Sequence, residues 1–212
     1  MRSGLILARP KIHKMEQRTP EWHEARCGKI TASPISNLLQ SPTSAGYDDY
    51  ITDLVYERMT GKPVQGFSGF WTKRGQRLEE PALVDFERRN FQVVQRVGFV
   101  ERVDLMAGCS PDGLIWKDGI IQVKCPKHTT LINYHLQSDS FDISRDVGWA
   151  YYCQMQFEMY ITGRKYNIFW VWHPYLEPFE RRLEPDKALF KRFPKVIKAA
   201  NILIEDRIRK LS

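Results

Sequence analysis

The chain has 212 residues, with 32 Lys and Arg against 25 Asp and Glu, which gives a formal net charge of +7. Apolar residues make up 42% of it and charged residues 27%, a composition that excludes disordered, collagen-like and low-complexity proteins. A chain of this length is expected to fold as one domain, residues 1–212, because no linker divides it. The positive balance indicates a polyanionic partner, either nucleic acid or an anionic membrane surface.

No apolar run approaches the roughly 18 residues of a membrane-spanning helix, and the run Leu5–Ala8 is too short for a signal peptide. We therefore expect a cytoplasmic protein with no membrane partner.

The four cysteines show no Cys-x-x-Cys spacing and the five histidines do not cluster, which argues against a zinc or iron–sulfur site. The cysteines are expected to be free thiols.

Helix signals dominate the first ninety residues. A hydroxyl residue before Pro, followed by an acid, predicts a helix over residues 19–28, and the same start signal recurs at 31–34. Apolar periodicity predicts a third helix, which ends near Gly61, and another helix whose apolar stripe includes residues 78–86.

The middle of the chain changes to the period of β-strands. The predicted strands cover residues 93–100, 106–115 and 119–125, and the last two are joined by a hairpin turn. Later elements are a helix and polar loop at 129–147, a helix at 148–162, a strand at 167–173 and a long amphipathic helix after residue 185. This order predicts a mixed α/β fold, with a central mixed β-sheet flanked by helices.

One segment carries residues suited to chemistry. Gln122 and Lys124 share one face of their strand, and Val123 points to the other, because successive side chains alternate. The hairpin allows Asp112 to meet that polar face. A carboxylate and a carboxamide together suit a hard divalent cation, and Lys124 is placed to orient a water molecule that the metal acidifies.

These residues resemble a known family. Ser-Pro-Asp-Gly at 110–113, followed by Val-Lys-Cys-Pro at 123–126, is similar to the PD-(D/E)XK nuclease signature in the form found in phage lambda-type exonucleases, the YqaJ-like viral recombinases. Three further blocks, residues 22–33, 74–79 and 152–160, are similar to that family in the same order. The resemblance covers about residues 20–165 and implies a restriction-endonuclease-like core.

The resemblance implies roles for individual residues. Asp112 would bind metal, Lys124 would be the catalytic lysine, and Glu79 would contact a metal from its helix. Gln154 would hold the lysine and the water, with Gln156 as a second candidate. The implied metal set is Asp112, Gln122, Val123 and Glu79; the implied catalytic set is Asp112, Gln122, Lys124, Glu79 and Gln154.

The resemblance also implies contacts with the DNA end. Arg26, Ser33 and Ser110, with Thr31 beside them, would bind a 5′-terminal phosphate, since a guanidinium fork and a helix N-terminus both suit an anion. We hypothesise that Phe70 or Trp71 splits the terminal base pair. Each of these residues could instead have a purely structural role. Arg26 could be a surface charge and Glu79 could lie on a solvated helix face. Gln154 could bond a buried backbone group, and Trp71 could belong to the core.

The function implied is Mg²⁺-dependent 5′→3′ digestion of one strand of linear double-stranded DNA, with Mn²⁺ as a substitute, leaving a 3′ overhang for recombination. The resemblance further implies a homotrimer and a single-strand annealing protein as partner. Gln122 departs from the family, which has Asp or Glu there. Either this lineage uses a glutamine, compensated by Glu79, or the sequence carries an inactivating substitution. The rival functions are an endonuclease of the same superfamily and a catalytically silent DNA-end-binding protein.

Overall fold

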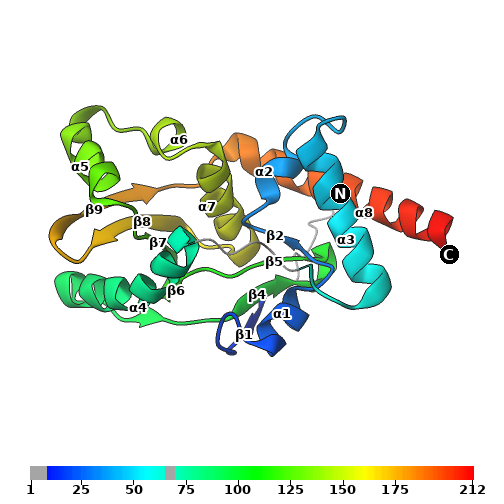
Figure 1. Cartoon of the computed structure of the whole chain (residues 1–212), viewed down its shortest axis with the longest axis horizontal. Helices are drawn as coiled ribbons and strands as arrows, with labels where there is room; N and C mark the ends of the chain where they lie inside the picture. The colour runs from blue at the N-terminus through cyan, green and yellow to red at the C-terminus, as the bar shows by residue number, and fades with distance from the viewer. Residues whose placement is uncertain (1–8, 65–69) are drawn as a thin grey trace, which may run out of the picture.

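A computed structural model of the chain describes residues 9–64 and 70–212. Helices and strands are interleaved along the chain (Figure 1). The strands are β1 (Lys11–His13), β2 (Ile30–Thr31), β3 (Val94–Gln95), β4 (Phe99–Arg102), β5 (Ala107–Cys109), β6 (Gly113–Ile115), β7 (Gly119–Lys124), β8 (Tyr166–His173) and β9 (Leu176–Leu183). The α-helices are α1 (Pro20–Arg26), α2 (Ile35–Leu38), α3 (Ala45–Thr60), α4 (Phe70–Asn90), α5 (His128–Leu136), α6 (Ile143–Asp146), α7 (Trp149–Thr162) and α8 (Lys187–Leu211).

The described strands form two sheets, in the orders β1-β4-β5-β2 and β3-β6-β7-β8-β9. Each is mixed, because β2 pairs with β5 and β7 pairs with β8 in parallel, whereas their other pairs are antiparallel. The predicted mixed α/β class is confirmed. The strand predicted over residues 106–115 is divided: β5 belongs to the first sheet and β6 to the second, and Ser110–Asp112 lies at the break.

Several predicted helix boundaries are confirmed by their capping contacts. The Thr19 hydroxyl accepts a hydrogen bond from the Trp22 backbone N–H at the start of α1. Gly61 and Gly163 end α3 and α7 in the left-handed conformation. The second start signal was only partly right, because α2 has four residues and its N-cap position, Pro34, makes no side-chain capping bond.

Strand β9 was missed by the sequence analysis. It contains Pro178 and several charged residues, and it lies at the edge of the five-stranded sheet, where it pairs only with β8 among the described strands. Charges and Pro are typical of edge strands, and they remove the apolar alternation that identifies a strand in sequence. The short β1, at the edge of the other sheet, was missed for a similar reason.

The five-stranded sheet is covered on both faces. Figure 1 shows α4 on one side and α7, with α5 and α6, on the other. Along β7, Ile121 and Val123 belong to the apolar cluster under α4, and Ile120 belongs to the larger cluster that includes α7. Gln122 and Lys124, at the same alternation as Ile120, therefore face α7. The predicted opposite orientation of Val123 is confirmed.

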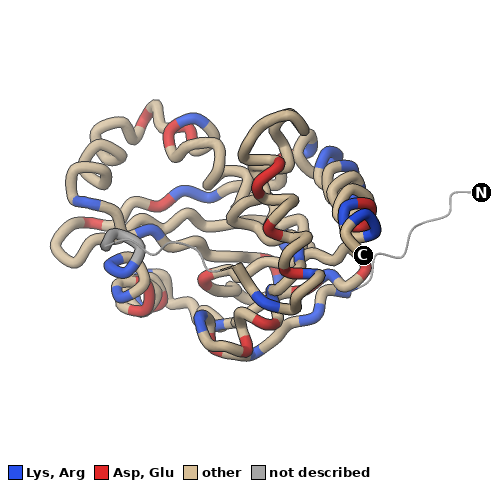
Figure 2. Tube along the Cα trace, turned by 45° about the vertical axis from the view of Figure 1, so that its right-hand side comes forward, with Lys and Arg blue, Asp and Glu red and all other residues tan. Residues whose placement is uncertain are grey.

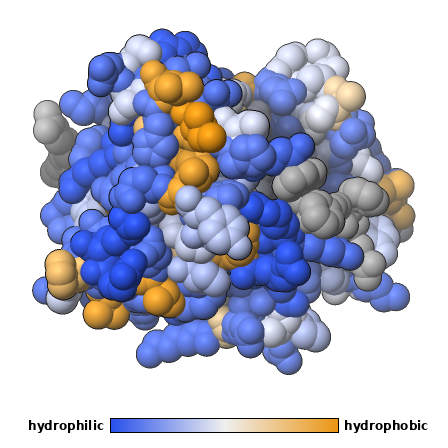
Figure 3. Space-filling model, turned by 60° about the vertical axis from the view of Figure 1, so that its left-hand side comes forward, coloured by the Kyte–Doolittle hydropathy of each residue, from blue (hydrophilic) through white to orange (hydrophobic). Residues whose placement is uncertain are grey.

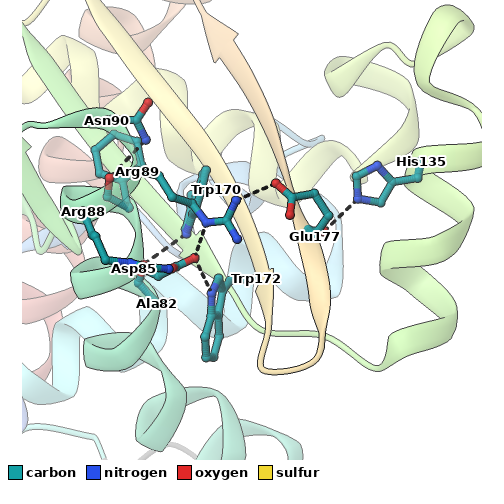
Figure 4. A network of polar contacts seen from close by, with 10 residues as sticks. Ala82, Asp85, Arg88, Arg89, Asn90, His135, Trp170, Trp172 and Glu177 are labelled. Carbon is teal, nitrogen blue, oxygen red and sulfur yellow. Dashed lines mark hydrogen bonds and ion pairs between the residues drawn. The ribbon is translucent and has the colours of Figure 1, made fainter.

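Polar contacts fix α4 on the sheet (Figure 4). Trp172 Nε1 donates to Asp85 Oδ2 at 3.0 Å, and Trp170 Nε1 donates to a backbone carbonyl of α4 at 3.1 Å. Arg89 bonds both Asp85, at 2.8 Å, and Glu177 of β9, at 2.6 Å. These contacts hold the helix at one end.

A second anchor holds the other end of α4. Arg74 Nη1 donates to the backbone carbonyl of Cys125 at 2.6 Å and to that of Pro126 at 3.1 Å, directly after β7. Glu79 lies between the two anchors. Its place relative to the end of β7 is therefore set by contacts at both ends of its helix.

Charges are spread over the whole fold. Figure 2 shows Lys and Arg interspersed with Asp and Glu on most elements, and the face in Figure 3 is largely hydrophilic, crossed by a strip of apolar residues. Several cations of the basic α8 are paired, as in Arg207 with Asp48 and Lys210 with Asp206. Across the part of the chain described, no helix has the length and apolar character needed to cross a membrane.

Candidate active site

A cavity of about 780 Å³ lies where β7, α4, α7 and the segment around α1 meet. Its lining brings together most of the predicted site residues. They are Arg26, Ser33, Glu79, Ser110, Asp112, Gln122, Val123, Lys124 and Gln154. Segments from residue 26 to residue 154 thus converge on one hollow. The cavity is the candidate active site.

Asp112 lies at the point where the two sheets separate. The antiparallel register pairs Gly113 with Ile121, so one further residue places Asp112 opposite Gln122. Asp112 Oδ2 accepts a hydrogen bond from the Val123 backbone N–H at 2.6 Å and another from Gln122 Nε2. Burial, followed by the nearby charge of Glu79, raises the pKa of Asp112. The cavity therefore concentrates negative charge that a bound cation would stabilise.

Gln122 is 2% exposed and makes two directed contacts. Its Nε2 donates to Asp112, and its Oε1 accepts from Gln154 Nε2 at 2.9 Å. The resemblance implied Gln122 as a metal ligand, but in this arrangement its amide oxygen is bonded to Gln154 and its NH₂ group faces Asp112.

Gln154 connects this pair to a carboxylate that the sequence analysis missed. Its Nε2 also donates to Glu158 Oε1 at 3.0 Å, and Glu158 Oε2 accepts from Asn167 Nδ2 at 3.0 Å. Glu158 is completely buried, and burial, followed by the charge of Asp112, raises its pKa to about 8. Its spacing from Gln154 could have identified Glu158 in the sequence, because two residues four positions apart in a helix lie on one face.

Lys124 lines the cavity beside these acids. Its ammonium nitrogen lies 4.6 Å from the centre of the Tyr151 ring on α7, a distance suited to a cation–π contact. Its positive charge lowers the pKa of Asp112, against the effects of burial and Glu79. The ammonium group and the carboxylate therefore face the same cavity.

Glu79 projects from α4 and pairs with Arg18, whose Nη2 lies 2.5 Å from Glu79 Oε2. Arg18 was not predicted, because it stands in an irregular basic segment with no motif spacing. Its backbone has a φ of 71°, in the left-handed region that non-glycine residues rarely adopt. Such strain occurs at functional sites, and Arg18 adds a cation to the cavity wall.

A second group of polar contacts surrounds Ser110, two residues before Asp112. Ser110 Oγ accepts from Arg26 Nη1 at 2.8 Å and from Trp22 Nε1 at 2.9 Å. The Arg26 guanidinium lies 4.2 Å from the centre of the Trp22 ring. Ser33 is exposed and lines the same cavity, although no capping side chain is found at the helix that follows it. Arg26, Ser110 and Ser33 thus form a site suited to an anion.

Two predicted residues of the described chain, Thr31 and Gln156, do not line this cavity. Thr31 is buried, and its backbone N–H donates to the Tyr50 hydroxyl at 2.9 Å. Gln156 is buried and bonds the Glu184 carbonyl and the Asp186 N–H, at 3.0 and 2.8 Å, so it satisfies backbone groups beside α8. The Phe67–Gly69 part of the predicted wedge lies outside the described residues, as do the side chains of Phe70 and Trp71.

The donors of the cavity suit a hard divalent cation. In residues 9–64 and 70–212, no three or more His, Cys, Asp or Glu side chains form a group that could hold a metal ion. Two carboxylates, Asp112 and Glu79, nevertheless line the hollow, and burial, followed by the charge of Glu79, raises the pKa of Asp112. Oxygen donors of this type are those that Mg²⁺ prefers, with water molecules completing its shell.

Comparison with known proteins identifies the family. The YqaJ-like viral recombinase domain matches residues 21–165, which is most of the chain. The chain belongs to this family. No curated protein matches the sequence. Several solved structures are similar to the chain over nearly its whole length.

An alkaline exonuclease, LHK-Exo, from Laribacter hongkongensis is similar to this chain at a TM-score of 0.78 and 29% identity, covering 91% of this chain and 96% of that one. The structure of LHK-Exo in complex with dAMP gives a TM-score of 0.79 and 30% identity over the same shares. A phage-related exonuclease from Haemophilus somnus 129PT, at 14% identity, has a TM-score of 0.65 and shares the fold, covering 87% and 96% of the two chains.

The buried carboxyl of Glu158 should make stability depend on pH. Its folded pKa of about 8 exceeds the ordinary value of 4.5, so the folded state binds more protons between these values. The free energy of unfolding should therefore fall as pH rises through this window. Glu158→Gln should reduce that fall and stabilise the protein at about pH 9 by at least about 1 kcal/mol, measured by chemical denaturation.

The introduced amide has a partner available, because Asn167 Oδ1 is buried without a hydrogen bond. Glu205→Gln, at an exposed position on α8, is the control and should leave the pH profile unchanged. A steeper loss of stability at alkaline pH in Glu158→Gln would contradict the assignment of a raised pKa.

Proposed function

We propose that this protein is an Mg²⁺-dependent exonuclease that digests the 5′-ended strand of linear double-stranded DNA. One observation carries the proposal. The anion site, formed by Arg26 and Ser110, opens into the same cavity as Asp112 and Lys124. A terminal phosphate and the neighbouring phosphodiester bond could occupy the two sites together. Membership of the recombinase family and the similarity to the alkaline exonuclease support this function.

Each residue has a distinct task in this mechanism. Asp112 and Glu79 would hold the cation, which supplies charge stabilisation and an acidified water when bound. Lys124 would orient that water toward the scissile phosphate and assist its deprotonation. Arg26, through its fork of N–H donors, would hold the end phosphate and set which bond lies beside Asp112. Gln154 would fix the amide of Gln122 against Asp112.

We further propose the biological setting that the family resemblance implies. The protein would act in the cytoplasm of a bacterium or phage-infected host, as a homotrimer around DNA. Its product, a 3′ single-stranded overhang, would pass to a single-strand annealing protein for recombination. Mn²⁺ would substitute for Mg²⁺, because both are hard cations that accept oxygen ligands.

Digestion of a 5′-phosphorylated linear duplex, compared with a closed circle, tests the reaction. The linear DNA should be degraded only with Mg²⁺ or Mn²⁺, and the circle should remain intact. Lys124→Ala should slow digestion by at least about 100-fold, the usual contribution of a group that assists proton transfer. Lys198→Ala, on the exposed face of α8, is the control. Cutting of the closed circle would instead indicate an endonuclease.

The end-phosphate site predicts a preference between DNA ends. The parent should digest a 5′-phosphorylated duplex faster than a 5′-hydroxyl one, and Arg26→Ala should reduce that ratio by about 10- to 100-fold, the value of one charged hydrogen bond. Initial rates on both substrates measure the ratio. Arg145→Ala removes a cation outside the cavity and should preserve it. Equal rates of digestion of the two substrates by the parent would contradict the role of Arg26 in binding the end phosphate.

Gln122 predicts a measurable effect on the cation requirement. Gln122→Glu adds a carboxylate opposite Asp112, so the Mg²⁺ concentration for half-maximal digestion should fall by about ten-fold. Without divalent cations the same variant should be less stable, by about 1–3 kcal/mol, because it removes a donor to Asp112 and adds a like charge. Gln95→Glu, exposed on β3, is the control. An inactive parent with an active Gln122→Glu variant would identify Gln122 as an inactivating substitution, and tight binding of DNA ends by that inactive parent would identify a silent DNA-end-binding protein.

A further inference from the structure

Glu158 is an acidic group that the proposed mechanism does not use, and its surroundings are unusual. It is 0% exposed on α7, and it forms no salt bridge with Lys or Arg in the described part of the chain. A buried carboxyl without a counter-ion is costly to the fold. Buried titratable groups near a cleft are candidates for a functional role, and Glu158 lies one side chain away from the cavity.

A continuous chain of hydrogen bonds leads from Glu158 to Asp112. Glu158 accepts from Gln154 at 3.0 Å, Gln154 donates to Gln122 at 2.9 Å, and Gln122 donates to Asp112. The sheet register contributes to this alignment, because Asn167 lies beside Ile120 on the parallel strand and so faces α7, where it bonds Glu158. Two positions of α7, one position of β7 and Asp112 in the turn before β6 thus form a single path.

The two carboxylates determine the direction of these bonds. An ionised carboxylate only accepts hydrogen bonds, so the Gln154 NH₂ group must serve Glu158, and its second N–H meets the Gln122 oxygen. The Gln122 NH₂ group is then directed to Asp112. Both donors to Asp112 use Oδ2, which leaves the second carboxylate oxygen available to the cavity.

We propose that Glu158 is a positioning residue of the cation site, which provides through Gln154 the negative charge that the neutral Gln122 lacks. This inference rests on the proposed function, in that the cation is the one needed for hydrolysis. Glu158 does not contact the cation itself. It orients the two amides and, when ionised, adds one negative charge to the electrostatic potential at Asp112, so α7 supplies the acid that β7 lacks at Gln122.

The test measures cation binding without DNA. Mn²⁺ alone is titrated into the full-length protein at about pH 9, above the raised pKa of Glu158, and free Mn²⁺ is followed by its electron paramagnetic resonance signal. Glu158→Gln should weaken Mn²⁺ binding by about ten-fold or more, the effect of one unit charge at this range in a partly buried site. Glu205→Gln, which removes an exposed acid of the same charge, should bind as the parent does.

A purely structural role predicts a different pattern. If Glu158 only supported the fold, its replacement would lower stability and cation affinity together, whereas we expect stability at alkaline pH to rise while affinity falls. The double variant Gln122→Glu/Glu158→Gln returns the charge to β7 at constant net charge, and it should bind Mn²⁺ within about three-fold of the parent. Unchanged affinity in Glu158→Gln, or a double variant no better than that single variant, would overturn the proposal.

The same set of proteins separates this inference from the proposed function. If the parent binds Mn²⁺ but does not digest linear DNA, the proposed function fails, and the Glu158 effect on Mn²⁺ affinity is still measured. If the parent digests DNA with Mg²⁺ and Glu158→Gln binds Mn²⁺ equally well, only the role of Glu158 fails. Lys124→Ala should lose digestion but bind Mn²⁺ at least as tightly as the parent, because its ammonium group is not a ligand and its positive charge opposes the cation. A parent that binds no Mn²⁺ overturns the inference.

Discussion

The two hydrogen bonds received by Asp112 Oδ2 are the interaction on which the site depends. One comes from the backbone of β7 and the other from the side chain opposite Asp112 in the register. The chain leaves one sheet after Cys109 and enters the other at Gly113, so the turn between them has no ladder partners to hold it. The carboxylate replaces those partners. It secures the turn and places its charge in the cavity.

The packing on either side of β7 explains why the cavity opens there. Val123 packs under α4, whereas Gln122 lies under α7, in a layer where buried polar side chains such as Glu158 and Asn167 stand among apolar ones. A polar side chain in such a layer is stable only when its hydrogen bonds are satisfied, and Gln154 and Asp112 satisfy them. Beyond Gln122 the strand ends at the half-buried Lys124, and the apolar layer gives way to the polar walls of the cavity.

Much of this arrangement was accessible from sequence, because local rules determine it. Alternation along β7 predicted the shared face of Gln122 and Lys124, and the turn at Gly119 predicted the hairpin that brings Asp112 back. Contacts between distant segments were not accessible. The pairing of Arg18 with Glu79 joins two segments whose order in the chain says nothing of their distance. The sequence left Gln156 as a second candidate beside Gln154, and only the rotation of α7 shows that Gln156 bonds the backbone beside α8.

Glu158 shows why composition is a poor guide to the electrostatics of a site. The net charge of +7 counts every acid equally, but most of the 25 acids of this chain are exposed or half-buried, and several pair with a cation, so that each has little effect at the cavity. Burial and then the charge of Asp112 raise the pKa of Glu158, and burial and then the charge of Glu79 raise that of Asp112. A neutral residue at position 122 is therefore compatible with an acidic site, because the charge that governs cation binding is set by burial and distance rather than by one position in a motif.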